Sequence, residues 1–219
     1  MVLVAVGDDD TAELLLVLQN IGVVGKNQVD TGLGVIREHE TGIDEHHVVA
    51  ALEDRHVLAD AVKAADPTLR FGVSPQGNPD NDRNEQYTDL SVWLTASGAD
   101  AVVDYLCPQI YWGYGYTLSS GSTRFAFENI TAEWLALPRA ESTALYFGLG
   151  AYRIGVGDGG ANADSVSQWC TGSALARQVT DLRSAGAGGW ALYRYGSLFR
   201  SDESGLAAAE RAALTALDG

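Results

Sequence analysis

The amino-acid sequence predicts an α/β protein built on a parallel sheet, because strand-like and helix-like segments alternate from about residue 57 onward. The strand-like segments begin near residues 69, 102, 144 and 188, roughly 33 to 44 residues apart, which is the length of a strand–loop–helix unit. Polar and aromatic residues follow these strands, whereas the turns before them are short. This asymmetry is typical of a (β/α) barrel, whose functional site lies at the carboxyl ends of its strands. A doubly wound sheet also fits, although no strand leads into a glycine-rich phosphate loop.

Each unit carries local signals for where its elements begin and end. Residues 57–65 are expected to finish a helix at Asp66-Pro67, because the residue before a proline disfavours helical backbone. Residues 69–74 form a short strand, and a polar loop, 76–84, leads to a helix that stops at Gly98. The remaining segments alternate in the same way: strand 101–112, a helix carrying Phe127, Ile130 and Trp134, strand 143–148, a helix from Ser173 to Gly186, strand 188–193 and a final helix that opens at Ser204.

The composition describes a globular chain with a strongly acidic balance. Hydrophobic residues make up 46% and charged residues 20% of its 219 residues, and the formal net charge is −15 at pH 7. This charge argues against nucleic acid and anionic membrane surfaces as partners. No apolar run is long enough to predict a membrane span, and residues 1–6 are too short for the apolar core of a signal peptide.

The first 56 residues differ in composition from the rest of the chain. All 5 Phe, 5 Trp and 9 Tyr residues lie at position 71 or later, so the first segment has little with which to build a dense core. All 4 His residues lie in that segment, at His39, His46, His47 and His56. They lack the spacing and the partner ligands of a metal site, so no metal and no cofactor are expected.

The most informative stretch is Pro108-Gln109-Ile110-Tyr111-Trp112, at the end of the second strand. An amide, a phenol and an indole stand where a buried strand would stay apolar. Flat aromatic side chains suit the apolar face of a pyranose, and an amide suits its rim of hydroxyl groups. The stretch therefore fits a sugar-binding surface, and it equally fits a core strand that runs into an aromatic-rich loop.

Other polar residues near the expected site carry less information. Five acidic residues follow predicted strands without standing at a strand tip, and we expect solvated loop charges at Asp80, Asp82, Glu85, Asp158 and Asp164. Asp104 opens its strand and is expected to be structural. Residues 155–160 predict a flexible loop. Cys107 is expected to be a buried hydrophobe, although a disulfide bridge to Cys170 is also open.

Four stretches of the chain, in the same order, resemble strands of the glycosyl-hydrolase-like family 10 proteins. They are Asp66–Pro75, Asp104–Trp112, Leu145–Arg153 and Gly189–Tyr195. The second is the most specific, because Asp104-Tyr105 and Pro108-Gln109 precede Tyr111-Trp112 as they do in the family. The resemblance covers about residues 57–219, and the family consists of bacterial (β/α)8-barrel glycosidases and envelope lipoproteins.

The resemblance implies that residues 57–219 form strands five to eight, the C-terminal half of a (β/α)8 TIM barrel. Residues 1–56 do not match the family's first half, and no apolar strand of adequate length leads into Asp8-Asp9-Asp10. We expect an unrelated or poorly ordered N-terminal segment, from a frameshift or a mis-called start, or else a divergent extension. The open edges of a half barrel predict self-association.

The function that the resemblance implies is glycoside hydrolysis of bacterial polysaccharide, with cell-wall peptidoglycan glycan as the expected substrate. The parent protein is expected to be secreted or an envelope-associated lipoprotein. The family's acidic fourth-strand segment has no counterpart here, so the catalytic carboxylates are unknown and the catalytic half is expected to be missing. Two alternatives are a noncatalytic carbohydrate-binding half barrel and an inactive truncated product.

Seven residues are predicted to bind the substrate. Alternation along the second strand places Gln109 and Tyr111 on one face and Trp112 on the other, with Gln109 directed into the barrel mouth. Tyr111, Trp112 and Tyr114 would form a stacking platform, although a core role for Trp112 fits equally well. Arg194 ends the last strand, where it would bind a carboxylate or form a structural ion pair. The complete set is Ser74, Gln109, Tyr111, Trp112, Tyr114, Arg194 and Tyr195.

Overall fold

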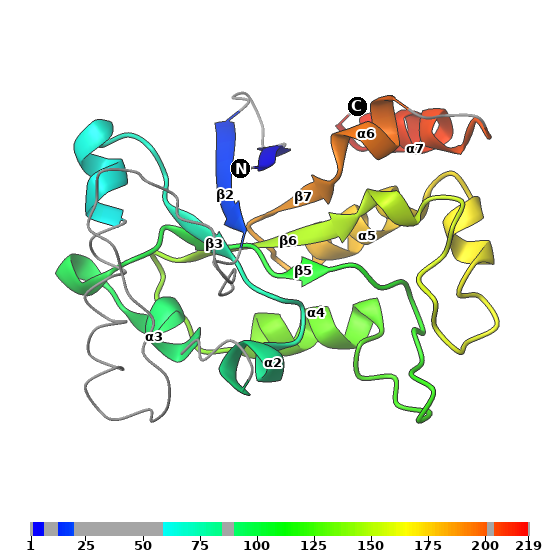
Figure 1. Ribbon diagram of the computed structural model, residues 1–219, viewed down its shortest axis with the longest axis horizontal. Helices are drawn as coiled ribbons and strands as arrows, with labels where there is room; N and C mark the ends of the chain where they lie inside the picture. The colour runs from blue at the N-terminus through cyan, green and yellow to red at the C-terminus, as the bar shows by residue number, and fades with distance from the viewer. Residues whose placement is uncertain (1, 7–12, 20–58, 85–89, 201–203, 219) are drawn as a thin grey trace, which may run out of the picture.

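The computed structural model shows an α/β fold with a largely parallel sheet (Figure 1). It describes residues 2–6, 13–19, 59–84, 90–200 and 204–218. The strands are β1 (Val2–Val6), β2 (Glu13–Gln19), β3 (Gly72–Ser74), β4 (Tyr105–Leu106), β5 (Gln109–Ile110), β6 (Ala144–Gly150) and β7 (Gly189–Tyr193). Every pairing from β2 to β7 is parallel, which confirms the predicted α/β class. That the sheet is half of an eight-stranded barrel stays a prediction.

Neighbouring strands in the sheet are neighbours along the chain, as in a barrel. The order is β1, β2, β3, β4, β6, with β7 on the other side of β6 and β5 beside β6 beyond β4. The segment predicted as one strand, 101–112, is therefore two short strands that both pair with β6. The break falls at Cys107-Pro108, where proline has no N–H to offer the ladder.

The N-terminal residues add two strands that the sequence did not predict. β1 pairs with β2 in antiparallel fashion, and β2 joins β3 in parallel. The expectation that no adequate strand leads into Asp8-Asp9-Asp10 was wrong, because β1 ends at Val6 and five residues is an ordinary strand length. β1 also lies against β7. Residues 20–58, with all four histidines, lie outside the described residues, and self-association and a domain boundary at residue 57 stay predictions.

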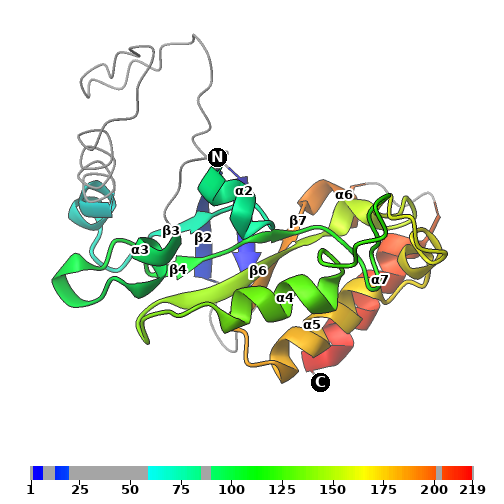
Figure 2. The ribbon, with the colours of Figure 1, turned by 90° about the horizontal axis from the view of Figure 1, so that it is seen from below.

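Side chains alternate between the two faces of the sheet, as predicted for the second strand. On one face, the strand residues Ile110, Phe147 and Leu149 pack against helical residues that include Ile130, Trp134, Leu175 and Val179. Figure 2 shows the helices α4 (Phe127–Ala136) and α5 (Ala174–Ser184) running along this side. The opposite face carries a smaller buried cluster of Tyr105, Cys107, Tyr146 and Ala191.

The helices begin and end close to the predicted positions. Residues 59–65 are helical, and α3 (Leu90–Thr95), α4, α5 and α7 (Leu206–Thr215) follow in order. The turn that closes α5 contains Gly186, where φ is +78° and the Gly186 and Ala187 N–H groups donate to Arg183 O and Leu182 O. This is the left-handed C-terminal turn that glycine favours. A short helix, α6 (Tyr195–Phe199), follows β7 and was not predicted.

The start of α5 is capped by a residue from another helix. Ser173 occupies the N-cap position, as predicted, but its side chain makes no capping hydrogen bond. Instead the buried carboxylate of Glu210, from α7, accepts hydrogen bonds from Ala174 N at 2.6 Å and Leu175 N at 3.1 Å. A carboxylate at this position also complements the helix dipole. Burial raises the pKa of Glu210 above its usual value, against the lowering effect of these backbone donors.

The polar loop predicted at 76–84 is partly helical. α2 spans Pro79–Asn84, and the Asn78 Oδ1 atom accepts a hydrogen bond from Asp80 N at 3.1 Å. Asparagine before a proline at the first helical position is a strong helix-start signal, because the side chain caps the helix and the proline preorganises its φ angle. The segment was predicted to be a loop because its residues are mostly polar, and this helix-start signal was overlooked.

The two cysteines do not form a disulfide bridge. Cys107 is buried and Cys170 is exposed, and both thiols are free, so the open alternative of a bridge was wrong. Burial raises the pKa of the Cys107 thiol to about 12. Within the described ranges, no helix is long and apolar enough to cross a membrane.

Candidate functional site

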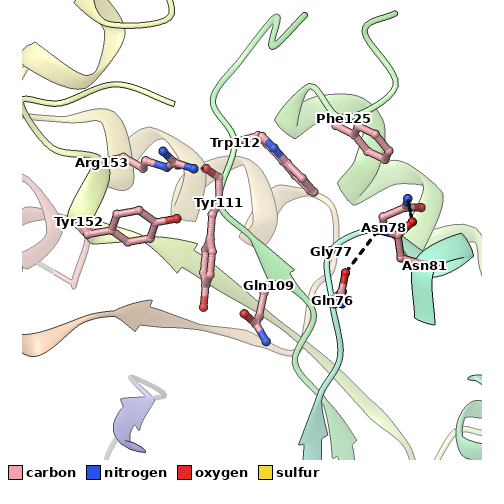
Figure 3. A pocket seen from close by; sticks show the side chains of 10 residues that line it. All are labelled: Gln76, Gly77, Asn78, Asn81, Gln109, Tyr111, Trp112, Phe125, Tyr152 and Arg153. Atoms are coloured by element: carbon pink, nitrogen blue, oxygen red, sulfur yellow. Dashed lines mark hydrogen bonds between the residues drawn. The ribbon is translucent and has the colours of Figure 1, made fainter. Parts of the chain in front are cut away.

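A cavity of about 560 Å³ opens at the carboxyl ends of β3, β5 and β6, the end of the sheet where a barrel carries its site. Its volume falls within the range typical of ligand pockets. Gln109 begins β5, and the other lining residues follow these three strands or precede α4: Gln76, Gly77, Asn78, Asn81, Tyr111, Trp112, Phe125, Tyr152 and Arg153. Figure 3 shows Tyr152 and Arg153 on one side and Asn78 and Asn81 on the other.

Four of the polar lining residues carry side-chain amides: Gln76, Asn78, Asn81 and Gln109. Asn78 Nδ2 donates to Asn81 Oδ1 at 2.8 Å, and Asn81 Nδ2 donates to Gln76 Oε1 at 3.4 Å (Figure 3). Gln109 Nε2 donates to Ser74 O at 3.2 Å, while its Oε1 accepts no hydrogen bond from another described residue. Amides both donate and accept, so this group matches the hydroxyl rim of a sugar.

Trp112 and Phe125 form an aromatic wall beside the amides. Their rings stack with centroids 5.0 Å apart and planes 20° apart. The loop after β3 approaches this wall closely, since a Cβ atom at Gly77 would lie 2.4 Å from Gln109 O and 2.7 Å from Trp112 Cζ3. Trp134 of α4 holds the loop from beneath by donating from Nε1 to Gly77 O at 2.8 Å. Trp112 therefore lines the cavity and also packs against the core, while its role in stacking on a sugar stays a prediction.

Three tyrosines from successive strands meet on the inner side of the cavity. Tyr111 stacks on Tyr193 with centroids 5.6 Å apart, and Tyr152 packs edge-on against both rings. Gly150 of β6 leaves space for Tyr111, because an added Cβ atom would lie 3.3 Å from the Tyr111 Cβ atom. Burial raises the pKa of Tyr111 and of Tyr152, so both phenols stay protonated hydrogen-bonding groups at neutral pH.

Arg153 is the one charged residue in the lining. It stands at the end of a short 3-10 helix, Ala151–Arg153, that follows β6 directly. Its Nε donates to Tyr111 O at 3.2 Å and its Nη1 to Gly157 O at 3.4 Å. Its guanidinium carbon lies 4.7 Å from the centre of the Tyr152 ring, within cation–π range.

Asp158 organises the loop next to the cavity. Its buried Oδ2 atom accepts hydrogen bonds from Gly113 N at 2.8 Å and Trp169 Nε1 at 3.2 Å, and its Oδ1 accepts from Gly160 N at 3.0 Å. The expectation of a solvated charge was therefore wrong for this residue. The hydrogen bond from Gly113 links residues 155–160, which were predicted to be a flexible loop, to the segment after β5.

The other acidic candidates lie away from the lining. Asp80 pairs with Arg124 at 2.5 Å, and Asp164 is exposed. Asp104 accepts from Lys63 Nζ and Phe71 N, which confirms its structural role. Glu85 and the side chain of Asp82 lie outside what the structure describes. No aspartate or glutamate is among the ten lining residues, and the described part of the chain holds no cluster of His, Cys, Asp or Glu suited to a metal ion.

The structure brings together three of the seven predicted site residues. Gln109, Tyr111 and Trp112 line the cavity. Their role in binding stays a prediction. The other four, Ser74, Tyr114, Arg194 and Tyr195, lie outside the lining.

Each of these four has a different environment. Ser74 is buried and donates from Oγ to Cys107 O at 2.8 Å. Tyr114 turns toward α5, where its hydroxyl donates to Asp181 at 2.5 Å and Arg177 covers its ring. Arg194 is exposed at the end of β7. Tyr195 is 61% exposed and stacks on Phe199 in α6.

Sequence reasoning missed most of the lining. Tyr152 and Arg153 end a stretch that resembles a family strand, yet no role was assigned to them. Asn78 and Asn81 belonged to a segment read only as a polar loop. Phe125 precedes the first residue of α4 by two positions and carries no local signal of its own. Tyr152 and Arg153 could have been predicted from their position, because they follow a strand directly at the carboxyl end of the sheet.

Comparison with known proteins identifies the family. A family model described as glycosyl hydrolase-like 10 matches residues 54–166, just over half of the chain. The chain belongs to this family. The matched region contains every residue of the cavity lining, from Gln76 to Arg153.

The chain is also similar to a named protein. The glycosyl hydrolase YngK of Bacillus subtilis (strain 168) is 28% identical over 134 residues, which cover 54% of this chain and 23% of the relative. The chain thus spans about a quarter of the length of that protein. The suspected family membership is confirmed, while residues 167–219 fall beyond the family match.

Proposed function

We propose that this chain is part of a glycoside hydrolase that acts on bacterial polysaccharide, and that its cavity is a binding subsite for cell-wall glycan. The observation that carries the proposal is the lining itself, where an aromatic wall of Trp112 and Phe125 stands beside four amides. Aromatic faces stack on the C–H face of a pyranose, and amides satisfy its hydroxyl groups. The site belongs to a protein of the secreted or envelope-associated kind.

The cleavage chemistry needs groups that the cavity does not contain. Glycoside hydrolysis generally uses two carboxyl groups, about 5 Å apart for retention or about 6.5–9.5 Å apart for inversion. The described lining holds none. Under the proposal, Tyr111, Gln109 and Asn78 hold a sugar ring beside the scissile bond, and the two acids come from parts of the protein that the described residues do not include.

The acid-free lining favours a second candidate, a noncatalytic carbohydrate-binding module. The two candidates share the cavity and differ in turnover. Incubation of the complete protein of which this chain is proposed to be part with peptide-free peptidoglycan strands, followed by a reducing-end assay, separates them: release of new ends supports the hydrolase, whereas affinity without release supports the module.

Isothermal titration calorimetry with soluble peptide-free glycan strands tests the cavity itself. Trp112→Ala is expected to weaken the affinity at least about tenfold, because it removes one stacking wall. Tyr195→Ala is the matched control, since Tyr195 is an exposed aromatic residue outside the lining. Equal affinities for Trp112→Ala and the unaltered chain would refute the role of the cavity.

A further inference from the structure

We propose that Arg153 makes the cavity selective for glycans that carry a carboxylate, an inference that rests on the proposed glycan-binding function. Arg153 supplies the only charge in a lining otherwise made of amides, aromatic rings and a glycine. A cation in such a site recognises an anionic substituent on the sugar rather than the hydroxyl groups that all glycans share.

The guanidinium of Arg153 is held in place by neutral groups. The carbonyl oxygens of Tyr111 and Gly157 accept from its Nε and Nη1, and the ring of Tyr152 lies beneath it. Arginine has five N–H donors, so after the two carbonyl oxygens and a hydrogen bond to the Tyr152 side chain at least two remain for a ligand. A guanidinium held in this way can bind a carboxylate through two hydrogen bonds.

The charge of Arg153 has no counter-charge among the described residues. No ion pair joins it to an aspartate or glutamate there. Asp158, in the adjoining loop, already accepts hydrogen bonds from Gly113, Gly160 and Trp169. Arg124 provides the contrast, because it pairs with both Asp80 and Glu133. In a chain of net charge −15, an arginine without an acidic partner in a cavity is available for a ligand anion.

The carboxylate adds to binding that the rest of the cavity provides. Hydrogen bonds between ionised partners are roughly twice as strong as neutral ones. A glycan with one carboxylate at Arg153 is therefore expected to bind at least about tenfold more tightly than a neutral glycan of the same length.

The test compares two tetrasaccharides by titration calorimetry: a hyaluronan tetrasaccharide, in which glucuronate alternates with N-acetylglucosamine, and neutral chitotetraose. Arg153→Gln is expected to weaken hyaluronan binding at least about tenfold and chitotetraose binding less than about twofold. Arg153→Lys keeps the charge without the fork and should fall between. Arg139→Gln, an exposed arginine on the segment after α4, removes the same charge and should change neither affinity.

The outcomes separate this inference from the function on which it rests. If the unaltered chain binds chitotetraose as tightly as hyaluronan, or if Arg153→Gln weakens both equally, the selectivity is refuted while glycan binding stands. If it binds neither glycan but binds peptide-free peptidoglycan strands, only the selectivity is refuted; if it binds none of the three, the proposed function is refuted as well. Should Arg153→Gln fail to fold, a salt titration of the unaltered chain decides: added NaCl must weaken hyaluronan binding and leave chitotetraose binding unchanged.

Discussion

Replacing Asp158 with alanine should strongly destabilise the protein. The carboxylate joins three segments, because it accepts hydrogen bonds from Gly113 after β5, from Gly160 in its own loop and from the Trp169 indole. Asp158→Ala removes all three acceptor contacts. The bonds to Gly113 and Trp169 are buried, so water cannot replace the lost oxygen without opening the loop.

The size of the effect follows from these two buried donors. A buried donor left without an acceptor costs about 1–3 kcal/mol, so the free energy of unfolding should fall by about 4 kcal/mol in Asp158→Ala. A chain of this size loses about 2–4 °C of melting temperature for each kcal/mol, which predicts a shift of about 10 °C. Asp158→Asn keeps one acceptor oxygen and should lose about half as much.

Thermal melting followed by circular dichroism measures the shift. Asp164→Ala is the matched control, because Asp164 lies in the same loop, is exposed and its side chain accepts only from Ser167 Oγ at 3.3 Å. It should melt within about 2 °C of the unaltered chain. A melting temperature for Asp158→Ala that matches this control would refute the structural role assigned to Asp158.

Two further predictions concern buried ionisable groups. Cys107 should resist labelling by a thiol reagent at about pH 8 in the native protein while Cys170 reacts, since burial raises the Cys107 pKa to about 12; two labelled thiols before denaturation would contradict its burial. Glu210 titrates at a higher pKa in the folded than in the unfolded chain, so the folded state binds its proton more tightly. Urea unfolding measures the free energy of unfolding of the unaltered chain and of Glu210→Gln at several pH values. The stability of the unaltered chain relative to Glu210→Gln should fall as the pH rises above about 4.5. A relative stability that stays constant or rises would contradict the raised pKa.

The fold could largely be predicted because its signals are local. Helix ends at Gly186 and at Asp66-Pro67, and the spacing of the strands, depend on backbone preferences that a short window of sequence contains. The N-terminal hairpin was missed because β1 and β2 were judged against a family pattern rather than as short strands. The cap on α5 was unpredictable, since Glu210 reaches it from a helix that begins more than 20 residues later.

The site could be predicted only where a side chain's direction follows from strand geometry. Gln109 begins β5 and Tyr111 follows its last residue, so the two side chains keep the two-residue alternation of a strand and both reach the cavity as expected. Beyond a strand's end, tertiary contacts decide direction. Tyr114 turns outward to Asp181, and Asn78 is carried to the cavity by a loop that Trp134 holds. Local sequence patterns do not predict these long-range hydrogen bonds.

The most direct measurement is a crystal structure of the chain soaked with a peptide-free cell-wall tetrasaccharide. The account predicts a sugar ring in the cavity, against the aromatic wall of Trp112 and Phe125, with its hydroxyl groups within hydrogen-bond distance of Gln109 or Asn78. A ring bound instead on the exposed Tyr195–Phe199 pair, or no bound sugar at saturating concentration, would contradict it.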